Sequence, residues 1–407
     1  MYNDQYKALI NLLNEIQANN IDFNTFFKQA SEELKYIKND DKTDNIVLTI
    51  LENNYDIILS TGFIRELKRI YPKANLIVVL DENIKHFDNL LINNPHINEY
   101  FYVNLEASNL LSLIYNCINI GYQYFWNRNI TKAFVLSWPG SIAALFFNWL
   151  INAKERIGFG ESIINIYNND KQDFIFDKLL TNNIKHPKEL TNDLLRKYYI
   201  LESMGFKIDN KALELFIDKK NDNRKIICVD ISNVSPNWVF SIKKITQFLS
   251  QIINDNIYIM YKSNDLINER YFISLLTNNI YSDTKNIINK NQLIKYNINL
   301  MQNISLYIGN NTETMHIASV YNKPIIAFFA ESEDKELDGN LSLYKRLQPY
   351  AWLDNPPVKI LQPEYALDTC VIQENIGGCC VPYPHCINEI TIEQIKNAYN
   401  ELFPQGI

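Results

Sequence analysis

The sequence has no excess of positive charge. Its 39 Lys and Arg residues stand against 46 Asp and Glu residues, so the formal net charge is −7. Proteins that hold nucleic acid through a basic surface show the opposite balance. We therefore predict no nucleic-acid partner.

Long apolar runs are also missing. The best candidate, residues 141–150, is only ten residues long and carries Asn148, which is too short and too polar to span a bilayer. Residues 1–7 lack the basic-then-apolar pattern of a secretory signal. We expect a cytoplasmic protein without a transmembrane segment. Peripheral contact with the inner face of the inner membrane is left open.

The most informative stretch of the chain is residues 306–329, which predict a strand, a polar turn, a helix and a second strand. Such a turn places backbone N–H groups and a helix N-terminus at the carboxyl edge of a parallel sheet, where α/β folds bind phosphorylated ligands. His316 falls one turn into the helix. A purely structural reading is equally open: Asn310 and Glu313 have capping-box spacing, and His316 is then an ordinary helix histidine.

Four segments organise the chain, whose 407 residues favour two domains. Residues 1–43 read as a helical extension. Residues 44–208 and 209–390 each alternate apolar strands with helices, and residues 391–407 form a C-terminal helix and tail. Two consecutive series of this kind predict an α/β protein with two Rossmann-like domains facing across a cleft. The expected strands are 45–51, 75–80, 95–103, 133–137, 153–159, 225–230, 256–261, 306–308 and 324–329. The expected helices of the two domains include 56–70, 142–150, 188–204, 238–253 and 265–276.

Several segments, in order, resemble the ADP-heptose:lipopolysaccharide heptosyltransferases of glycosyltransferase family 9, which have the GT-B fold. The segments are residues 46–51, 56–61, 67–72, 94–99, 156–159, 311–316 and 384–391. The resemblance implies an inverting, metal-independent sugar transfer. The first domain takes the acceptor and the second takes the nucleotide sugar.

Asp56 lies where the family has its general base, which must reach the acceptor hydroxyl within hydrogen-bond distance. The structural alternative for Asp56 is an acid favoured by a helix dipole. The resemblance places the donor on the turn before the His-bearing helix and on neighbouring polar residues. These donor-binding candidates are Ser232, Asn237, Glu269, Asn311, Thr312, Glu313, Thr314, Met315 and His316.

The chain departs from the family pattern at four places. Tyr55 stands where a Gly usually precedes the base, Asn311 replaces an Asp, and Glu313 replaces a Gly. The fourth place is residues 235–238, Ser-Pro-Asn-Trp, which carry no Lys before the Trp. A diphosphate leaving group needs its growing charge stabilised. Either the helix N-terminus with Ser232 and Asn237 suffices, or a cation comes from elsewhere, for which Lys262 is a candidate.

Four cysteines cluster near the C-terminus, an unusual feature in a cytoplasmic protein. Thiolate-rich sites suit zinc or iron, and part of the spacing resembles the iron site of the autotransporter heptosyltransferases. No CxxC pair is present, so a loop of reduced thiols is the alternative to a structural metal. The four residues are Cys370, Cys379, Cys380 and Cys386.

These observations favour a glycosyltransferase that uses ADP-heptose or a related nucleotide sugar and needs no cofactor for its chemistry. The acceptor is expected to be a cell-envelope glycolipid such as lipopolysaccharide core. One alternative is an autotransporter-type enzyme that modifies a protein hydroxyl. The other is a GT-B protein that binds a nucleotide or glycan without turnover.

Overall fold

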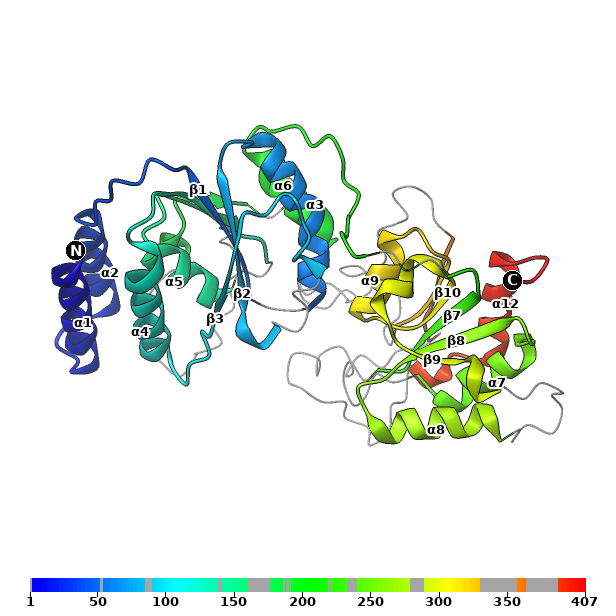
Figure 1. The fold of residues 1–407 in the computed structure, drawn as a ribbon. Helices are drawn as coiled ribbons and strands as arrows, with labels where there is room; N and C mark the ends of the chain where they lie inside the picture. Colours follow the sequence, from blue (N-terminus) through cyan, green and yellow to red (C-terminus); the bar gives the residue numbers. More distant parts are fainter. Residues whose placement is uncertain are drawn as a thin grey trace. The chain divides into compact units, whose positions relative to one another are not determined.

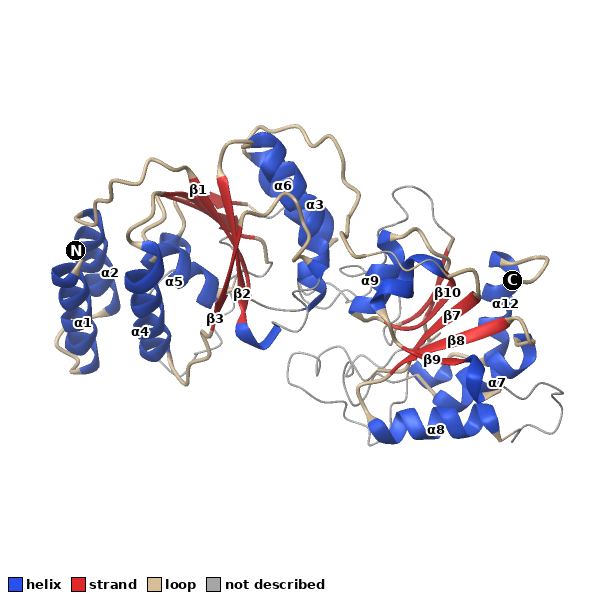
Figure 2. Ribbon diagram, viewed as in Figure 1, coloured by secondary structure: helices blue, strands red, loops and turns tan. Residues whose placement is uncertain are grey.

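The computed structural model describes residues 2–51, 54–84, 90–137, 141–159, 176–185, 187, 190, 192–218, 220, 222–232, 240–278, 289–329, 357–363 and 387–407. The chain divides into two compact units, Met1–Lys211 and Ala212–Ile407. Each unit contains one six-stranded sheet with helices on both faces (Figures 1 and 2).

The sheet of the first unit has the order β3-β2-β1-β4-β5-β6, and all its strands are parallel. This is the doubly wound Rossmann order, in which the topology reverses between the first and fourth strands. Its strands are β1 (Asn45–Ile50), β2 (Asn75–Asp81), β3 (Glu99–Val103), β4 (Ile130–Val135), β5 (Glu155–Phe159) and β6 (Asn182–Ile184). The helices are α1 (Asn3–Gln17), α2 (Phe23–Lys35), α3 (Asn54–Ile70), α4 (Leu110–Ile120), α5 (Ile142–Leu150) and α6 (Asp193–Ser203), with short helices η2 (Gly121–Phe125) and η3 (Phe176–Leu179).

The second unit repeats the same order with β12-β11-β10-β7-β8-β9, again all parallel. Its strands are β7 (Lys225–Asp230), β8 (Ile257–Lys262), β9 (Leu293–Lys295), β10 (Ile304–Asn310), β11 (Ile325–Phe328) and β12 (Val358–Leu361). The helices are α7 (Ile242–Ile252), α8 (Leu266–Thr277), α9 (Glu313–Val320) and α12 (Ile392–Leu402), with short helices η4 (Lys290–Gln292), η5 (Ile298–Asn303) and η7 (Ile387–Glu389). Figure 1 shows α9 on one face of this sheet and α7, α8 and α12 on the other.

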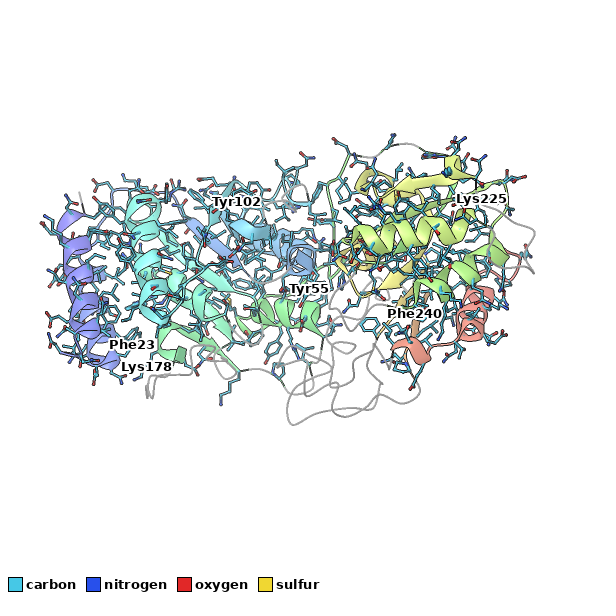
Figure 3. The ribbon with its side chains drawn as sticks, turned by 90° about the horizontal axis from the view of Figure 1, so that it is seen from below. Phe23, Tyr55, Tyr102, Lys178, Lys225 and Phe240 are labelled. Atoms are coloured by element: carbon cyan, nitrogen blue, oxygen red, sulfur yellow. The ribbon has the colours of Figure 1, made fainter. Side chains whose placement is uncertain are left out.

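The predicted N-terminal helical extension is confirmed as α1 and α2, which pack over α4 and α5 on one face of the first sheet (Figure 1). Aromatic rings make much of this contact. The ring of Phe23, which is labelled in Figure 3, meets that of Phe146 edge-on, with 5.8 Å between the ring centroids. Tyr2 contacts Trp126 at 6.4 Å. Because these rings are buried, the extension shares the core of the first unit.

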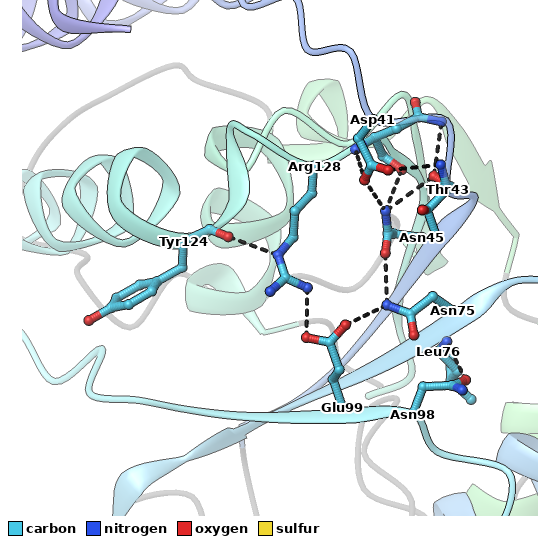
Figure 4. Close-up of polar contacts among 10 residues, drawn as sticks. Asp41, Thr43, Asn45, Asn75, Leu76, Asn98, Glu99, Tyr124 and Arg128 are labelled. Carbon is cyan, nitrogen blue, oxygen red and sulfur yellow. Dashed lines mark hydrogen bonds and ion pairs between the residues drawn. The ribbon is translucent and has the colours of Figure 1, made fainter. Parts of the chain in front are cut away.

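A polar network ties the segment after α2 to the amino ends of the first sheet's central strands (Figure 4). The Asp41 carboxylate accepts hydrogen bonds from the Thr43 and Asn129 backbone N–H groups and from the Asn45 side chain. The Asn45 side-chain oxygen accepts from Asn75, which also donates to Glu99. α/β folds bind ligands at the carboxyl ends of their strands. This network lies at the opposite edge of the sheet. We therefore assign it a structural role.

Several sequence expectations needed correction at element ends. The strand expected over 95–103 begins at Glu99, and the helices expected from 188 and 238 begin at Asp193 and Ile242. The sequence missed β6, β9 and β12. Each of these strands is three or four residues long and lies at an edge of its sheet. Their partly exposed residues therefore do not produce the continuous apolar run of a central strand.

Candidate functional site

Asp56 lies in the first turn of α3, immediately beyond the carboxyl end of β1. This is the β1/β4 switch point of the first sheet, the usual ligand position of a doubly wound fold. Asp56 is 8% exposed and lines a small pocket at the ends of the two strands. The remaining lining residues are Thr49, Ile50, Leu51, Ser60, Leu136, Ser137, Ser141, Ala144 and Lys197.

Lys197, which the sequence reading missed, is the partner of Asp56. Its ammonium on α6 lies 2.7 Å from Asp56 Oδ1, and its side chain is only 3% exposed. An ammonium this deep in a protein requires a counter-ion. Lys197 stands on an amphipathic helix 141 positions away, so no local pattern could have paired the two residues. The pair fixes the position of the Asp56 carboxylate in the pocket.

The turn before α9, where the sequence predicts the donor to bind (the donor turn), begins at the equivalent switch point of the second sheet, between β7 and β10. Thr312 is the N-cap of α9, and its Oγ1 accepts from the Thr314 N–H at 3.2 Å. The structural alternative, a capping box formed by Asn310 and Glu313, is therefore wrong. Asn310 is instead the last residue of β10, and its side chain donates to the Ser232 carbonyl oxygen at 3.1 Å.

Asp230 is the buried centre of this turn and was not singled out by the sequence reading. It ends β7 and is fully buried. Its Oδ2 accepts from Thr312 Oγ1 at 2.6 Å, and its Oδ1 accepts from the Ser232 N–H at 2.9 Å. The available signal in the sequence was an acidic residue at the end of the mostly apolar strand 225–230. Asp230 thus holds the turns after β7 and β10 together.

Gly309 has no side chain, which allows β10 to lie close to Asp230. A Cβ atom at this position would lie 2.7 Å from the Asp230 carbonyl oxygen and 2.8 Å from the Tyr307 hydroxyl. Any side chain here would push the two strands apart. The Tyr307 hydroxyl in turn donates to the Asn310 carbonyl oxygen at 2.7 Å.

Lys262, the candidate cation, lies beside this turn. It ends β8, forms an ion pair with Glu313 and donates to Thr314 Oγ1 at 2.9 Å. Burial by itself would lower the pKa of Lys262, but the Asp230 and Glu313 carboxylates outweigh it and raise the pKa. Lys262 is therefore charged at neutral pH.

The remaining donor-binding candidates divide into three groups. Met315 and His316 are buried in the first turns of α9, and Asn311 immediately precedes the cap. Glu269 contacts Tyr261 and Lys295, on the neighbouring strands β8 and β9, rather than the turn. Asn237 lies outside the described residues.

Metal-binding clusters are absent from the part of the chain that the structure describes. The four C-terminal cysteines fall outside that part, so their metal site stays a prediction. The described cysteines, Cys117 and Cys228, are buried free thiols. None of the described helices is long and apolar enough to cross a membrane.

The architecture recurs in solved structures. A family 9 glycosyltransferase from Veillonella parvula matches with a TM-score of 0.63 and 16% identity, over 90% of this chain and 98% of the other. The chain has the GT-B fold. The ADP-heptose LPS heptosyltransferase II of E. coli matches this GT-B chain with a TM-score of 0.58 and 13% identity, over 89% and 99% of the two chains. E. coli heptosyltransferase WaaC with ADP matches at 0.59 and 8% identity, over 88% and 99%. No protein-family model and no curated protein sequence matches.

Proposed function

We propose that this GT-B protein is an inverting glycosyltransferase that transfers a heptose or related sugar from ADP-heptose, or a similar nucleotide sugar, to an acceptor hydroxyl. The proposal rests on the polar residues that lie at the switch point of each sheet, in a fold that matches heptosyltransferases over almost their full length. Two of the matching structures contain ADP and ADP-2-deoxy-2-fluoro heptose.

Asp56 is the proposed general base. As the acceptor oxygen attacks the anomeric carbon, its proton passes to the Asp56 carboxylate. The bond between the anomeric carbon and the diphosphate oxygen breaks on the opposite side, so the configuration inverts and the nucleoside diphosphate leaves. Lys197 holds the carboxylate at the pocket through their 2.7 Å ion pair.

The donor diphosphate is assigned to the turn before α9. Backbone N–H groups at a helix N-terminus favour an anion, and Lys262 offers the positive charge that the leaving group needs. Thr312 and Asp230 keep this turn in place through their 2.6 Å hydrogen bond. The proposal does not depend on a metal ion for the transfer.

The proposed acceptor is a cell-envelope glycolipid such as lipopolysaccharide core, reached from the cytoplasmic side of the inner membrane. A protein hydroxyl is the alternative acceptor. Transfer assays with delipidated lipopolysaccharide core and with a Ser-rich protein acceptor distinguish the two. Metal analysis of purified protein tests the cysteine cluster separately.

The first test is calorimetric titration with ADP, ADP-heptose, UDP-sugars and GDP-sugars. Selective binding of the adenine compounds supports the proposed donor, whereas binding of another nucleotide keeps the mechanism and changes the donor. Asp56→Asn is then expected to abolish transfer and to leave donor affinity unchanged. Binding of no nucleotide at all would overturn the proposed function.

A further inference from the structure

The ion pair between Lys262 and Glu313 joins two elements at the donor turn. Lys262 is the last residue of β8 and Glu313 is the first residue of α9. Their side chains are 19% and 17% exposed, so the pair lies near the surface and is open to exchange with a ligand. The Glu313 carboxylate is a negative charge in the first turn of α9.

Asp230 is a second counter-ion for Lys262, but its side chain is buried, whereas that of Glu313 is partly exposed. Its Oδ2 lies 3.8 Å from Lys262 Nζ, and its side chain is fully buried. Both of its oxygens already accept hydrogen bonds, from Ser232 and Thr312. Asp230 is therefore a fixed charge. Glu313 lies partly exposed in the first turn of α9, so its carboxylate can move away from Lys262 more easily.

The charge balance decides what an anionic ligand meets. One cation, Lys262, faces the two carboxylates of Asp230 and Glu313. The cluster therefore carries a net negative charge while Glu313 is paired with Lys262. A diphosphate arriving at the α9 N-terminus would be repelled by Glu313 and attracted by Lys262. The Ser232 hydroxyl belongs to a residue that is 6% exposed, and it has no hydrogen-bond partner among the described residues. It adds an unused polar group two residues after Asp230, which ends β7. A buried hydroxyl in this state is costly unless a ligand completes it.

We propose that Glu313 occupies, in the ligand-free protein, the place on Lys262 that the donor's diphosphate takes, and that it withdraws when the donor binds. The inference rests on the proposed function, because it assumes a nucleoside-diphosphate ligand at this turn. Glu313 is then a specificity-determining residue. It lowers the affinity for every ligand whose phosphates must displace it and has no effect on a nucleoside that carries no phosphate.

Titration calorimetry with ADP, inorganic pyrophosphate and adenosine tests this on the full chain. We expect Glu313→Gln to bind ADP and pyrophosphate about tenfold more tightly than the original protein, since one opposing charge near the ligand is removed. Adenosine affinity should not change. Lys262→Met should lose at least tenfold in ADP affinity, and Lys262→Arg should recover part of that loss. Glu393→Gln is the matched control, because Glu393 is also a first-turn acid that pairs with a lysine, in α12.

The outcomes separate the inference from the function it rests on. If the original protein binds ADP and Glu313→Gln binds it equally or more weakly, Glu313 positions Lys262 and the inference is overturned while the proposed function stands. If Glu313→Gln raises the affinity for pyrophosphate but ADP does not bind, the inference stands and the proposed adenine donor is wrong. If no variant binds either anion, both fail. Thermal unfolding of each variant confirms that it is folded.

Discussion

The Lys197 ammonium lies 2.7 Å from the Asp56 carboxylate, across 141 positions of sequence. Both side chains are almost fully buried, so each charge depends on the other. Removing one partner of a buried ion pair leaves an uncompensated charge, whereas replacing both can be nearly neutral. The pair therefore contributes to stability in a way that a double-mutant cycle can isolate.

We expect Lys197→Met to lower the free energy of unfolding by about 3 kcal/mol, the usual cost of leaving a buried charge unpaired. Asp56→Asn should also destabilise the protein, because it leaves Lys197 without its counter-ion. The double variant should lose less than the sum of the two. Denaturant titrations of the four proteins measure the coupling. Strict additivity would show that the two charges are solvated independently.

Thr312→Val removes a hydroxyl that caps α9 and donates to Asp230. Loss of the cap and of a buried charge-assisted hydrogen bond should together cost about 2–3 kcal/mol of stability. Nucleotide affinity should fall as well, since the turn loses its anchor. Thr312→Ser retains the hydroxyl and serves as the control. Equal stability of the Val and Ser variants would rule out this role for the hydroxyl.

Gly309→Ala places a Cβ atom within 3 Å of Asp230 and of the Tyr307 hydroxyl. Because β7 and β10 are paired strands, neither can move away without breaking its hydrogen bonds. We expect a loss of about 1–3 kcal/mol, typical of overpacking a core, together with weaker nucleotide binding. Chemical denaturation and calorimetry measure both. Unchanged stability would mean that the two strands separate freely here.

Asp41 gives a prediction for the dependence of stability on pH. The Thr43 backbone N–H, with help from Asn129 and Asn45, lowers the pKa of this carboxyl to about 2 from 3.8. A depressed pKa in the folded state contributes stability above pH 3.8 that is lost as the pH falls through about 2.

Asp41→Ala should therefore destabilise the protein at pH 7, and the difference from the original protein should shrink between pH 4 and pH 2. Asp41→Asn keeps a side-chain oxygen for Thr43 but not the charge, so it should show a smaller loss at pH 7. Urea unfolding across this pH range provides the measurement. A difference that grows as the pH falls would contradict the assigned sign.

The sequence alone determined the two-domain α/β fold, because buried parallel strands leave continuous apolar runs such as residues 45–50 and 225–230. It also identified the turn from Thr312 to His316, since polar residues directly after such a strand lie at the carboxyl edge of the sheet. Asp56 was identified through the family resemblance. Their functional roles remain predictions. The short edge strands β6, β9 and β12 could not be read, because their partly exposed residues carry little apolar signal.

Only the tertiary structure decided the partners. Lys197 meets Asp56, Lys262 meets Glu313 and Thr312 meets Asp230 across 141, 51 and 82 positions of sequence. The order of the strands and the packing of the helices bring these residues together. The local sequence pattern does not encode either. The sequence therefore identified some of the polar residues at the carboxyl edges of the sheets, and the packing of strands and helices decided which charges face one another.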